Sequence, residues 1–213
     1  MKKTIYRTIF FCLSVIALAG CDLELQKNYD YEASVDDPHV NVTAWEYFQD
    51  HQDIFSEFTT AIEYTGLKDY YTQTENKYTY LALNNTAMQS YRENVFPGIA
   101  SIADCDKETV KNMLLYHIVD GEYSSYGQLQ VEAMFVLTML PGEKGLMTMS
   151  VWKNPWQAAV GKILVNETGS NGKSPQRNAK TSNILPTNGV IHIFEKYCYY
   201  PVSYTHLRAQ RLL

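Results

Sequence analysis

The sequence predicts an α+β fold in which short N-terminal helices pack on a β-rich wedge or sandwich. Between residues 42 and 117, apolar residues recur mainly at helical intervals. Residues 135–200 instead hold short β-branched and aromatic runs separated by Gly, Pro and Asn. One run, Val190–Phe194, follows an Asn188-Gly189 turn and is largely apolar on both faces, which is typical of a central strand covered on both sides. Helices followed by strands are the order of an α+β domain, and 213 residues suffice for one core.

The first 20 residues are predicted to be a signal peptide. Three basic residues precede the apolar stretch Ile9–Leu18, which is too short to span a membrane. The stretch ends in the sequence LAGC, which resembles the lipobox of bacterial lipoproteins, where cleavage precedes an acylated cysteine. An ordinary secretory signal with a chance cysteine is the alternative. We expect lipid on Cys21 to hold the protein on a membrane that it does not span.

Residues 21–41 are predicted to form an acidic tether. Asp22–Asp37 contains six acidic residues and one lysine, with no apolar period. Acidic residues soon after an acylated cysteine resemble the surface-export signals of some Bacteroidota lipoproteins, so an outer-membrane location is expected, facing the surface or the periplasm. Without the basic residues of the signal and of residues 201–213, 13 Lys and Arg face 23 Asp and Glu, a net charge of about −10. This charge argues against nucleic-acid binding.

Residues 42–129 are predicted to be mainly helical. Thr43 is the expected first N-cap, and Gly66 ends a helical apolar period. That period consists of Ile54, Phe55, Phe58, Ile62 and Leu67. Further helices are expected at Asn84–Tyr91 (capped by Asn84 or Asn85), Asp104–His117 (capped by Asp104 or Asp106) and, as a helical turn, Tyr123–Leu129. A strand, Tyr78–Leu83, interrupts this helical part.

The second half is predicted to be successive strands. Apolar and β-branched runs with turn residues between them are expected at Phe135–Leu140, Leu146–Trp152, residues 159–167 and Asn178–Leu185. Residues 141–145 are the expected turn between the first two strands. Gly169–Ser174 is expected to be a hairpin tip or loop.

Three segments resemble motifs of fasciclin-like domains. Thr187–Ile193, TNGVIHI, is similar to the second signature of that family, with Phe194 and Glu195 as mild substitutions. Thr79–Met88 aligns without gaps to the first signature, but apolar residues replace several of its positions. The pair Tyr116-His117 is similar to an internal Tyr-His motif, and we interpret it as a fold determinant. The positions that match, all interpreted as structural, are Thr79, Ala82, Asn85, Ala87, Tyr116, His117, Thr187, Asn188, Gly189 and His192.

This resemblance covers residues 42–200 and implies a fasciclin-like fold with a non-catalytic role in adhesion or extracellular ligand capture. Such lipoproteins resemble accessory components of outer-membrane nutrient uptake. The alternatives are a structural protein that docks another envelope protein, and an enzyme with an unrecognised site. No GxSxG, HExxH, P-loop or dinucleotide motif is present, so no cofactor is expected. The scattered histidines and cysteines show no metal-binding spacing.

Two cysteines, Cys105 and Cys198, remain in the predicted domain. They could pair in an oxidising compartment, but two independent buried thiols are the favoured interpretation. For ligand binding, Trp152 and Trp156 flank a predicted turn and are the candidate residues, since exposed aromatic rings stack on sugars. Glycan binding predicts that both are exposed. Structural docking predicts that they are buried and that another apolar patch is exposed. The expected partners are a membrane, through the lipid anchor, and a glycan or an envelope protein.

Residues 201–213 are interpreted as a translated sequencing adapter. Pro201–Leu207, PVSYTHL, resembles a translation of a transposon mosaic-end sequence, although the last few residues are not explained by it. We therefore exclude this segment from the domain.

Overall fold

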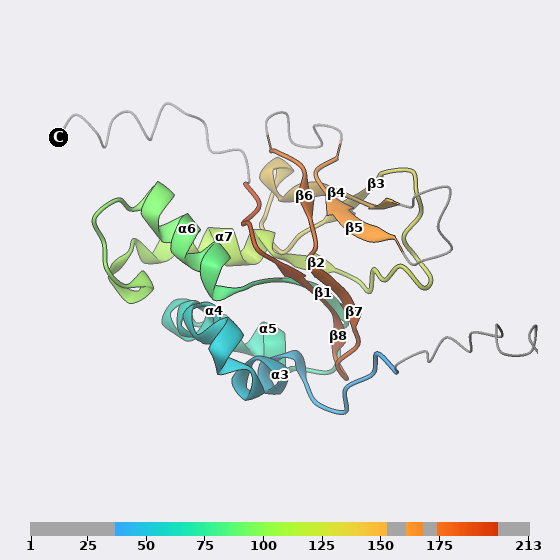
Figure 1. The fold of residues 1–213 in the computed structure, drawn as a ribbon, viewed down its shortest axis with the longest axis horizontal. Coiled ribbons are helices and arrows are strands. Elements are labelled where there is room, and N and C mark those ends of the chain that lie inside the picture. The colour runs from blue at the N-terminus through green and yellow to red at the C-terminus, as the bar shows by residue number, and fades with distance from the viewer. Residues whose placement is uncertain (1–36, 153–160, 168–173, 200–213) are drawn as a thin grey trace, which may run out of the picture. The chain divides into compact units, whose positions relative to one another are not determined.

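The computed structural model describes residues 37–152, 161–167 and 174–199 (Figure 1). The chain divides into Met1–Asp37 and a compact unit that begins at Pro38, to which all elements below belong. The expected signal peptide with Cys21, most of the expected tether, Trp156 and residues 201–213 lie outside the described residues.

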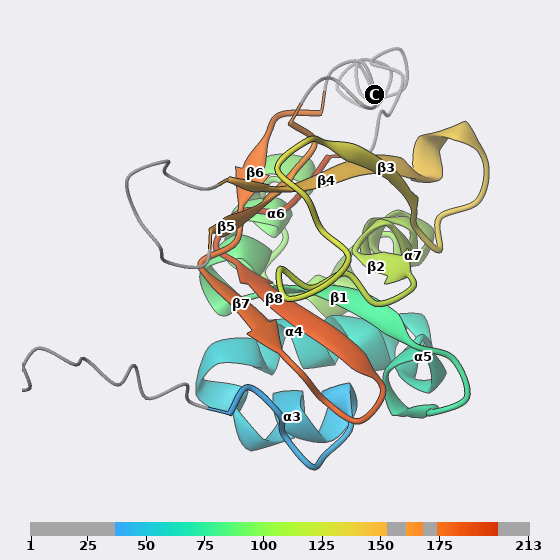
Figure 2. The same ribbon diagram turned by 90° about the vertical axis from the view of Figure 1, so that its right-hand side faces the viewer.

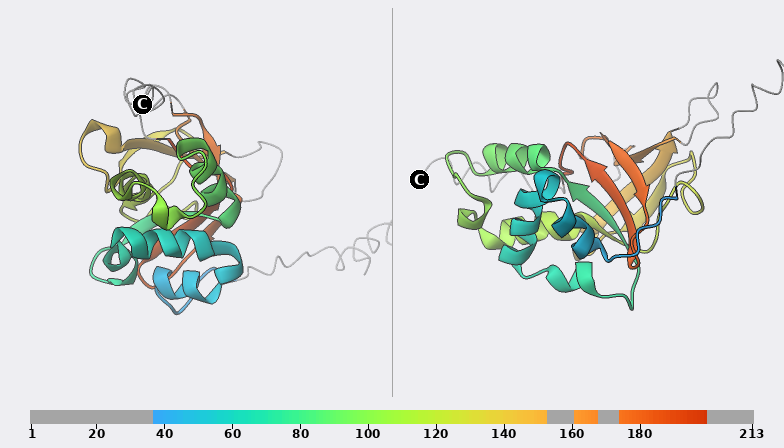
Figure 3. Two further views of the ribbon diagram at one scale, coloured as in Figure 1. Left: turned by 90° about the vertical axis from the view of Figure 1, so that its left-hand side faces the viewer. Right: turned by 60° about the horizontal axis from the view of Figure 1, so that its bottom comes forward.

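Within this unit the helices gather on one side and the strands on the other (Figures 1 and 3). The helices are α3 (Ala44–Asp50), α4 (Gln52–Thr65), α5 (Lys68–Thr72), α6 (Asn85–Val95), α7 (Lys107–Tyr116) and the 3-10 turns η1 (Ile102–Asp104) and η2 (Glu143–Gly145). Helix α4 contacts α3, α6 and α7, and it also packs on strand β1 (Tyr78–Leu83). The helical layer therefore covers one face of the sheet that contains β1.

Local sequence signals set the helix ends. Thr43 starts α3 as predicted: its side chain accepts a hydrogen bond from the Glu46 backbone, while the Glu46 carboxylate accepts one from Thr43 N at 2.7 Å. This reciprocal arrangement is a capping box. Gly66 ends α4 in the left-handed conformation (φ 75°), and its N–H donates to two carbonyls of the last turn. Asn84 caps α6 and Asp106 caps α7, each accepting a hydrogen bond from a first-turn amide.

The first sheet has the strand order β2-β1-β8-β7. Strands β1 and β8 (Gly189–Phe194) run parallel, with Tyr78 opposite Gly189 and Leu83 opposite Phe194. Every residue of both strands is buried, so the predicted central strand is confirmed. The antiparallel neighbours are β2 (Ile118–Asp120) beside β1 and β7 (Thr181–Ile184) beside β8.

Gly189 allows β1 and β8 to approach closely at the start of their pairing. Its φ is 150°, and a Cβ atom on Gly189 would lie 1.9 Å from the carbonyl oxygen of Tyr78. A side chain at this position would therefore push the two central strands apart. The second signature motif contributes a glycine where the sheet has no room for anything larger.

The second sheet has the order β3-β4-β5-β6 and is antiparallel throughout. Its strands are β3 (Met134–Leu137), β4 (Leu146–Trp152), β5 (Lys162–Val165) and β6 (Arg177–Asn178). Figure 2 shows it beside the first sheet, where the chain passes from β6 into β7. At the other end, Met139 N donates to Ile118 O at 2.8 Å, which links β2 to the chain just after β3. The two sheets are thus joined at both sides.

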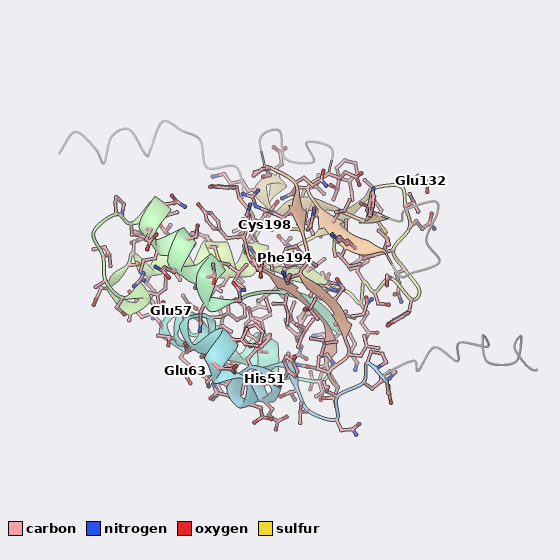
Figure 4. All side chains as sticks on the ribbon, in the orientation of Figure 1. His51, Glu57, Glu63, Glu132, Phe194 and Cys198 are labelled. Carbon is pink, nitrogen blue, oxygen red and sulfur yellow. The ribbon has the colours of Figure 1, made fainter. Side chains whose placement is uncertain are left out.

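The core fills the space between helices and sheets. An aromatic cluster connects the helical layer to β1, with Phe48 and Phe58 edge-on at 5.4 Å between ring centroids and Tyr71 stacked on Tyr80 at 5.1 Å. Such ring pairs add to the stabilisation gained from burial itself. Figure 4 shows Phe194 and Cys198 in the interior between the helices and the strands.

Five elements differ from the sequence expectations. Tyr123–Leu129 forms a turn and not a helix: Leu129 N donates to Ser124 O, five residues back rather than four, while Tyr123 N and Ser125 N donate to the side chains of Thr79 and Asn183. The expected strand Phe135–Leu140 is shorter, as β3 ends at Leu137. The expected strand Asn178–Leu185 is divided into β6 and β7, because the chain changes sheets between them: Ala179 N donates to Ile163 O of β5, and Lys180 N donates to Ile193 O of β8. The expected helices Asn84–Tyr91 and Asp104–His117 have different bounds, those of α6 and α7.

The domain also begins before the predicted boundary at residue 41. Leu185 N donates to Pro38 O, Val40 N donates to Leu185 O, and Thr187 N donates to Val42 O, all at 2.9–3.0 Å. Residues 38–42 therefore run along residues 185–187 as part of the compact unit. Backbone hydrogen bonds hold this segment in place. Such bonds do not require apolar side chains, so the sequence shows no apolar period here.

Candidate binding surface

Strands β3 and β4 expose large apolar side chains on their outer face. Phe135 and Leu137 alternate along β3, so they share a face, and their exposed fractions are 63% and 61%. Phe135 lies opposite Thr148, which puts Trp152 at the end of β4 on the same face, with an exposed fraction of 50%. Val131, 57% exposed, adjoins β4, since Gln130 O accepts a hydrogen bond from Val151 N. We call Val131, Phe135, Leu137 and Trp152 the β3–β4 patch.

The middle of this face is polar and covered. Thr148 and Ser150 lie on it between the apolar residues, yet both are buried. Glu167, just after β5, accepts a hydrogen bond from the Ser150 hydroxyl, and its own N–H donates to Thr148 Oγ1 at 3.1 Å. The inward face of the two strands carries the buried Val136, Met147, Met149 and Val151, which belong to the core. Only the outer, apolar positions of the patch are therefore available to a partner.

Trp152 and Trp156 were the candidates for ligand binding. The structure exposes half of Trp152, whose ring makes no aromatic contact within the described ranges, and Trp156 lies outside them. Trp152 lies on the face that also exposes Phe135 and Leu137. Sequence reasoning missed these two residues because every position of Met134–Leu137 is apolar, so the alternation gives no sign of which face is open. Large apolar side chains that gather on one exposed face are unusual, so Phe135 and Leu137 mark this face as a candidate binding surface.

The predicted motif residues lie almost entirely in the interior. Thr79, Ala82, Ala87, Tyr116, His117, Asn188, Gly189 and His192 are all buried. Asn85 is partly buried and ties α6 to α4: its Oδ1 accepts from Glu57 N at 3.0 Å and its Nδ2 donates to Asp53 O at 3.0 Å. Thr187 is exposed on the turn before β8, where its carbonyl accepts a hydrogen bond from the Lys77 amine. These residues join elements and offer little surface to a ligand.

His117 connects α7 to the C-terminal segment of the domain. Cys198 N donates to its Nε2 at 3.0 Å, so its Nδ1 carries the proton and donates to Met113 O at 2.7 Å. The ring is neutral in this arrangement, because one nitrogen accepts while the other donates. Burial lowers the pKa of His117 to about 4, against a partial rise from the Met113 hydrogen bond.

His192 has the same arrangement in β8. Asn183 N donates to its Nδ1 at 3.1 Å, and its Nε2 donates to Tyr123 O at 2.8 Å. Burial again lowers the pKa to about 4. Both histidines are therefore satisfied core residues that hold loops to strands and helices.

Comparison with known proteins agrees with this arrangement of motifs. Residues 53–199 match the fasciclin domain family. The chain belongs to the fasciclin domain family. The solved structure of a FAS1 domain pair from the insect cell adhesion molecule fasciclin I has the same fold, with 15% identity and a TM-score of 0.51. That match covers 73% of this chain and 50% of the other, so the chain spans about half the length of that solved structure. The predicted α+β, fasciclin-like fold is thus confirmed.

Membership of the fasciclin domain family places the chain among domains that generally act in adhesion. Among the described residues, no group of three or more His, Cys, Asp and Glu side chains could hold a metal ion. Within the same ranges, no helix has both the length and the apolar character needed to cross a bilayer. A hollow of about 310 Å³ lies where residues 39–41 run along residues 185–187, with Lys77 and Glu122 in its wall. This volume is near the lower end for small-molecule sites.

The two cysteines of the fasciclin domain are separate thiols. Cys105 and Cys198 are both buried and unpaired, in agreement with the interpretation favoured from the sequence. Burial raises the pKa of Cys198 to about 12, against an opposing effect of Arg177. A thiol with so high a pKa is a poor nucleophile at neutral pH, so Cys198 has a packing role.

Proposed function

We propose that this fasciclin domain is a membrane-tethered, non-catalytic adhesion module that binds a protein ligand through the β3–β4 patch. The observation that supports this proposal is the gathering of three large exposed apolar residues on one sheet face, Phe135, Leu137 and Trp152. Apolar residues scattered singly over a surface are ordinary, whereas several on one face are characteristic of an interaction site. Fully burying a Leu or Phe side chain contributes roughly 1.5–3 kcal/mol, so a few such anchors supply a useful affinity.

A protein ligand fits the chemistry of the patch better than a glycan does. Leu137 and Val131 are aliphatic, and neither offers a sugar the flat face or the hydrogen bonds it needs. Protein interfaces, in contrast, have cores of aromatic and aliphatic side chains. A glycan is the second candidate, and the half-exposed ring of Trp152 favours it. An envelope protein as the ligand would make the role one of structural docking.

The tether is part of this proposal and is supported by the sequence. The LAGC sequence and the acidic Asp22–Asp37 are typical of a lipid-anchored protein with a spacer between membrane and domain. We propose an outer-membrane location of the Bacteroidota type.

Replacing Cys21 with Ser should move the full-length protein from the membrane fraction to the soluble fraction. Recovery of Cys21→Ser in the membrane fraction would contradict lipid anchoring at this residue. An accessory role in nutrient uptake stays a prediction, for which gene neighbourhood is the test.

Cell attachment tests the ligand class. Cells that display the full chain are allowed to attach to immobilised cell-surface extract, which is left untreated, digested with protease or oxidised with periodate to destroy glycans. We expect attachment to be lost after protease and retained after periodate. The double variant Phe135→Ala/Leu137→Ala should attach severalfold less than the wild type, with equal display levels.

Exposed residues away from the patch provide the control. Ile54 and Ile99 are exposed apolar residues of the helical part, and the variant Ile54→Ala/Ile99→Ala should attach like the wild type. Loss of attachment after periodate, together with loss in Trp152→Ala, would replace the protein ligand with a glycan. Equal attachment of the patch variant and the wild type would rule out the patch.

A further inference from the structure

The hollow of about 310 Å³ lies where three segments that are distant in the sequence meet. Residues 39–41 line it from the segment before α3, which Figure 1 shows in blue beside the ends of β7 and β8. Lys77, just before β1, and Glu122, just after β2, line it from a second direction in the chain, and residues 185–187 line it from the turn before β8. A hollow of this volume is restricted to a small ligand.

Hydrogen bonds fix the three segments to one another. Backbone bonds of 2.9–3.0 Å hold residues 38–42 against residues 185–187. Gly121 N donates to Lys77 O at 3.2 Å, which joins the chain after β2 to the chain before β1. The Lys77 amine donates to the carbonyl of Thr187 and so connects these two segments to the turn. The hollow is therefore preformed, and a ligand would not have to order it.

Several polar side chains of the hollow are left without a protein partner. Within the described part of the chain, the Asn41 amide, the Glu122 carboxylate and the Thr187 hydroxyl make no hydrogen bond or ion pair. Glu122 does not pair with the nearby Lys77, whose amine is directed to Thr187 O and keeps further donors. These groups together offer hydrogen-bond donors and acceptors to a ligand in the hollow.

Apolar side chains line the same hollow. Val40, Leu185 and Pro186 contribute to its lining beside the polar groups. A saccharide ring has the complementary combination, because C–H groups cover its faces and hydroxyls surround its rim. Each hydroxyl both donates and accepts hydrogen bonds, so it can use a carboxylate, an amide or another hydroxyl as its partner. The mixed lining therefore fits a sugar.

The charges of the lining favour a neutral ligand. Lys77 contributes one positive charge and Glu122 one negative charge, and these cancel. A simple anion or cation would lie beside a charge of its own sign as well as the opposite one. An amino acid carries both charges, but it would use Lys77 and Glu122 and leave the Asn41 amide and the Thr187 hydroxyl without a role. A neutral polyhydroxy molecule uses all four groups.

We infer that this hollow binds a small neutral saccharide. Asn41, Glu122 and Thr187 exchange hydrogen bonds with its hydroxyls, and its ring packs on Leu185 and Pro186. These polar groups bond to water before the sugar arrives, so the net gain per hydrogen bond is modest and we expect a dissociation constant in the millimolar range. The site shares no residue with the β3–β4 patch, and the inference goes beyond the proposed function.

Saturation-transfer difference NMR on the purified full-length protein tests this inference. The detergent must have no sugar headgroup, since a maltoside would compete for the site. The probes are D-glucose, D-galactose, D-mannose and N-acetyl-D-glucosamine, each added separately, with L-alanine as the zwitterionic probe. We expect transfer to the protons of at least one sugar and none to L-alanine. Absence of transfer to all four sugars would overturn the inference.

A double variant places the sugar in the hollow. Asn41→Ala/Glu122→Ala removes two hydrogen-bonding side chains and should weaken sugar binding about 10-fold or more. Both residues are exposed, and thermal unfolding checks that the variant keeps its fold. The matched control Glu132→Ala/Asn178→Ala removes the same two residue types from exposed positions of the second sheet and should bind like the wild type.

Other outcomes would also overturn the inference. Equal sugar binding in the wild type and the hollow variant, or equal weakening in both double variants, would exclude a specific site here. Transfer to L-alanine that disappears in Glu122→Gln, with no transfer to sugars, would identify an amino-acid site. Sugar binding lost only in Trp152→Ala would move the sugar to the β3–β4 patch. The variant Phe135→Ala/Leu137→Ala should bind sugar like the wild type, so the two proposals can fail independently.

Discussion

Asn188 joins three segments of the fold through one buried side-chain amide. Its Oδ1 accepts a hydrogen bond from Ala44 N at 2.8 Å, and its Nδ2 donates to Tyr71 O at 2.9 Å and to Gln73 O at 3.1 Å. The first amide of α3 and the end of α5 are thus fixed to the turn before β8. The sequence interpretation gave Asn188 a backbone role in the turn, but the described residues with positive φ do not include it. The role of Asn188 therefore lies in the hydrogen bonds of its side-chain amide and not in a left-handed backbone conformation.

Replacing Asn188 with Ala should strongly destabilise the domain. The change leaves the buried Ala44 N–H and Tyr71 C=O and the part-buried Gln73 C=O without this partner, and each buried unsatisfied group costs about 1–3 kcal/mol. We expect the free energy of unfolding, measured by urea titration, to fall by about 2–5 kcal/mol. The exposed Asn41→Ala is the matched control and should change it by less than about 0.5 kcal/mol. A loss below 1 kcal/mol for Asn188→Ala would mean that water replaces the amide.

At the scale of elements, tertiary packing and end signals together stabilise the short helices. Helix α3 has seven residues, which is too few for stability in isolation. It buries Ala44, Trp45 and Phe48, and the Thr43 capping box satisfies amides of its first turn. Tertiary packing also stabilises the strands: β8 pairs with a strand on each side, and all of its residues are buried.

Removing the capping box of α3 should cost a measurable part of this stability. Thr43→Ala abolishes the side-chain acceptor for Glu46 N, and N-cap losses of this kind cost about 0.5–2 kcal/mol. Urea unfolding should show this decrease. Thr60→Ala, at an exposed position inside α4, removes a hydroxyl without a cap and should be neutral within about 0.5 kcal/mol. If both variants lose equal stability, the cap has no special role.

At the scale of the whole molecule, two neutral histidines connect distant parts of the chain. His117 holds the segment around Cys198 to α7, and His192 holds the segment around Tyr123 to β8. Each accepts a backbone N–H on one nitrogen, so protonation would break a hydrogen bond and bury a charge. Their folded-state pKa values are about 4, whereas an unfolded histidine titrates near 6.5.

Stability should therefore fall as the pH is lowered from about 6.5 to about 4. In this window the unfolded chain takes up protons that the folded chain does not, so the contribution of each histidine is complete above pH 6.5 and is lost as pH falls through the folded pKa. The loss is on the order of 3 kcal/mol per histidine. Urea unfolding at several pH values measures it. His117→Gln, compared with wild type, should show a pH slope smaller by about one proton, and an unchanged slope would contradict the neutral assignment.

Local chemistry made several features predictable from the sequence. Thr43, Gly66, Asn84 and Asp106 act through atoms within a few residues, so helix ends could be placed without knowing the fold. Val190–Phe194 is largely apolar on both faces, which is typical of a covered strand. The motif positions identified the fasciclin-like fold for the same reason: they are the positions where that fold leaves no choice of residue, as at Gly189.

Tertiary structure decided what depends on distant partners. Tyr123–Leu129 has the sequence of a helical turn, but it forms a wider turn closed by Leu129 N and Ser124 O, which side chains of Thr79 and Asn183 hold in place. Phe135 and Leu137 cannot be told from their buried neighbours by sequence, because exposure depends on which face of the strand the core covers. The sequence by itself determined the family, the caps and the central strand, since those rest on short-range rules. The exposed face of β3 and β4 was decided only when the two sheets met.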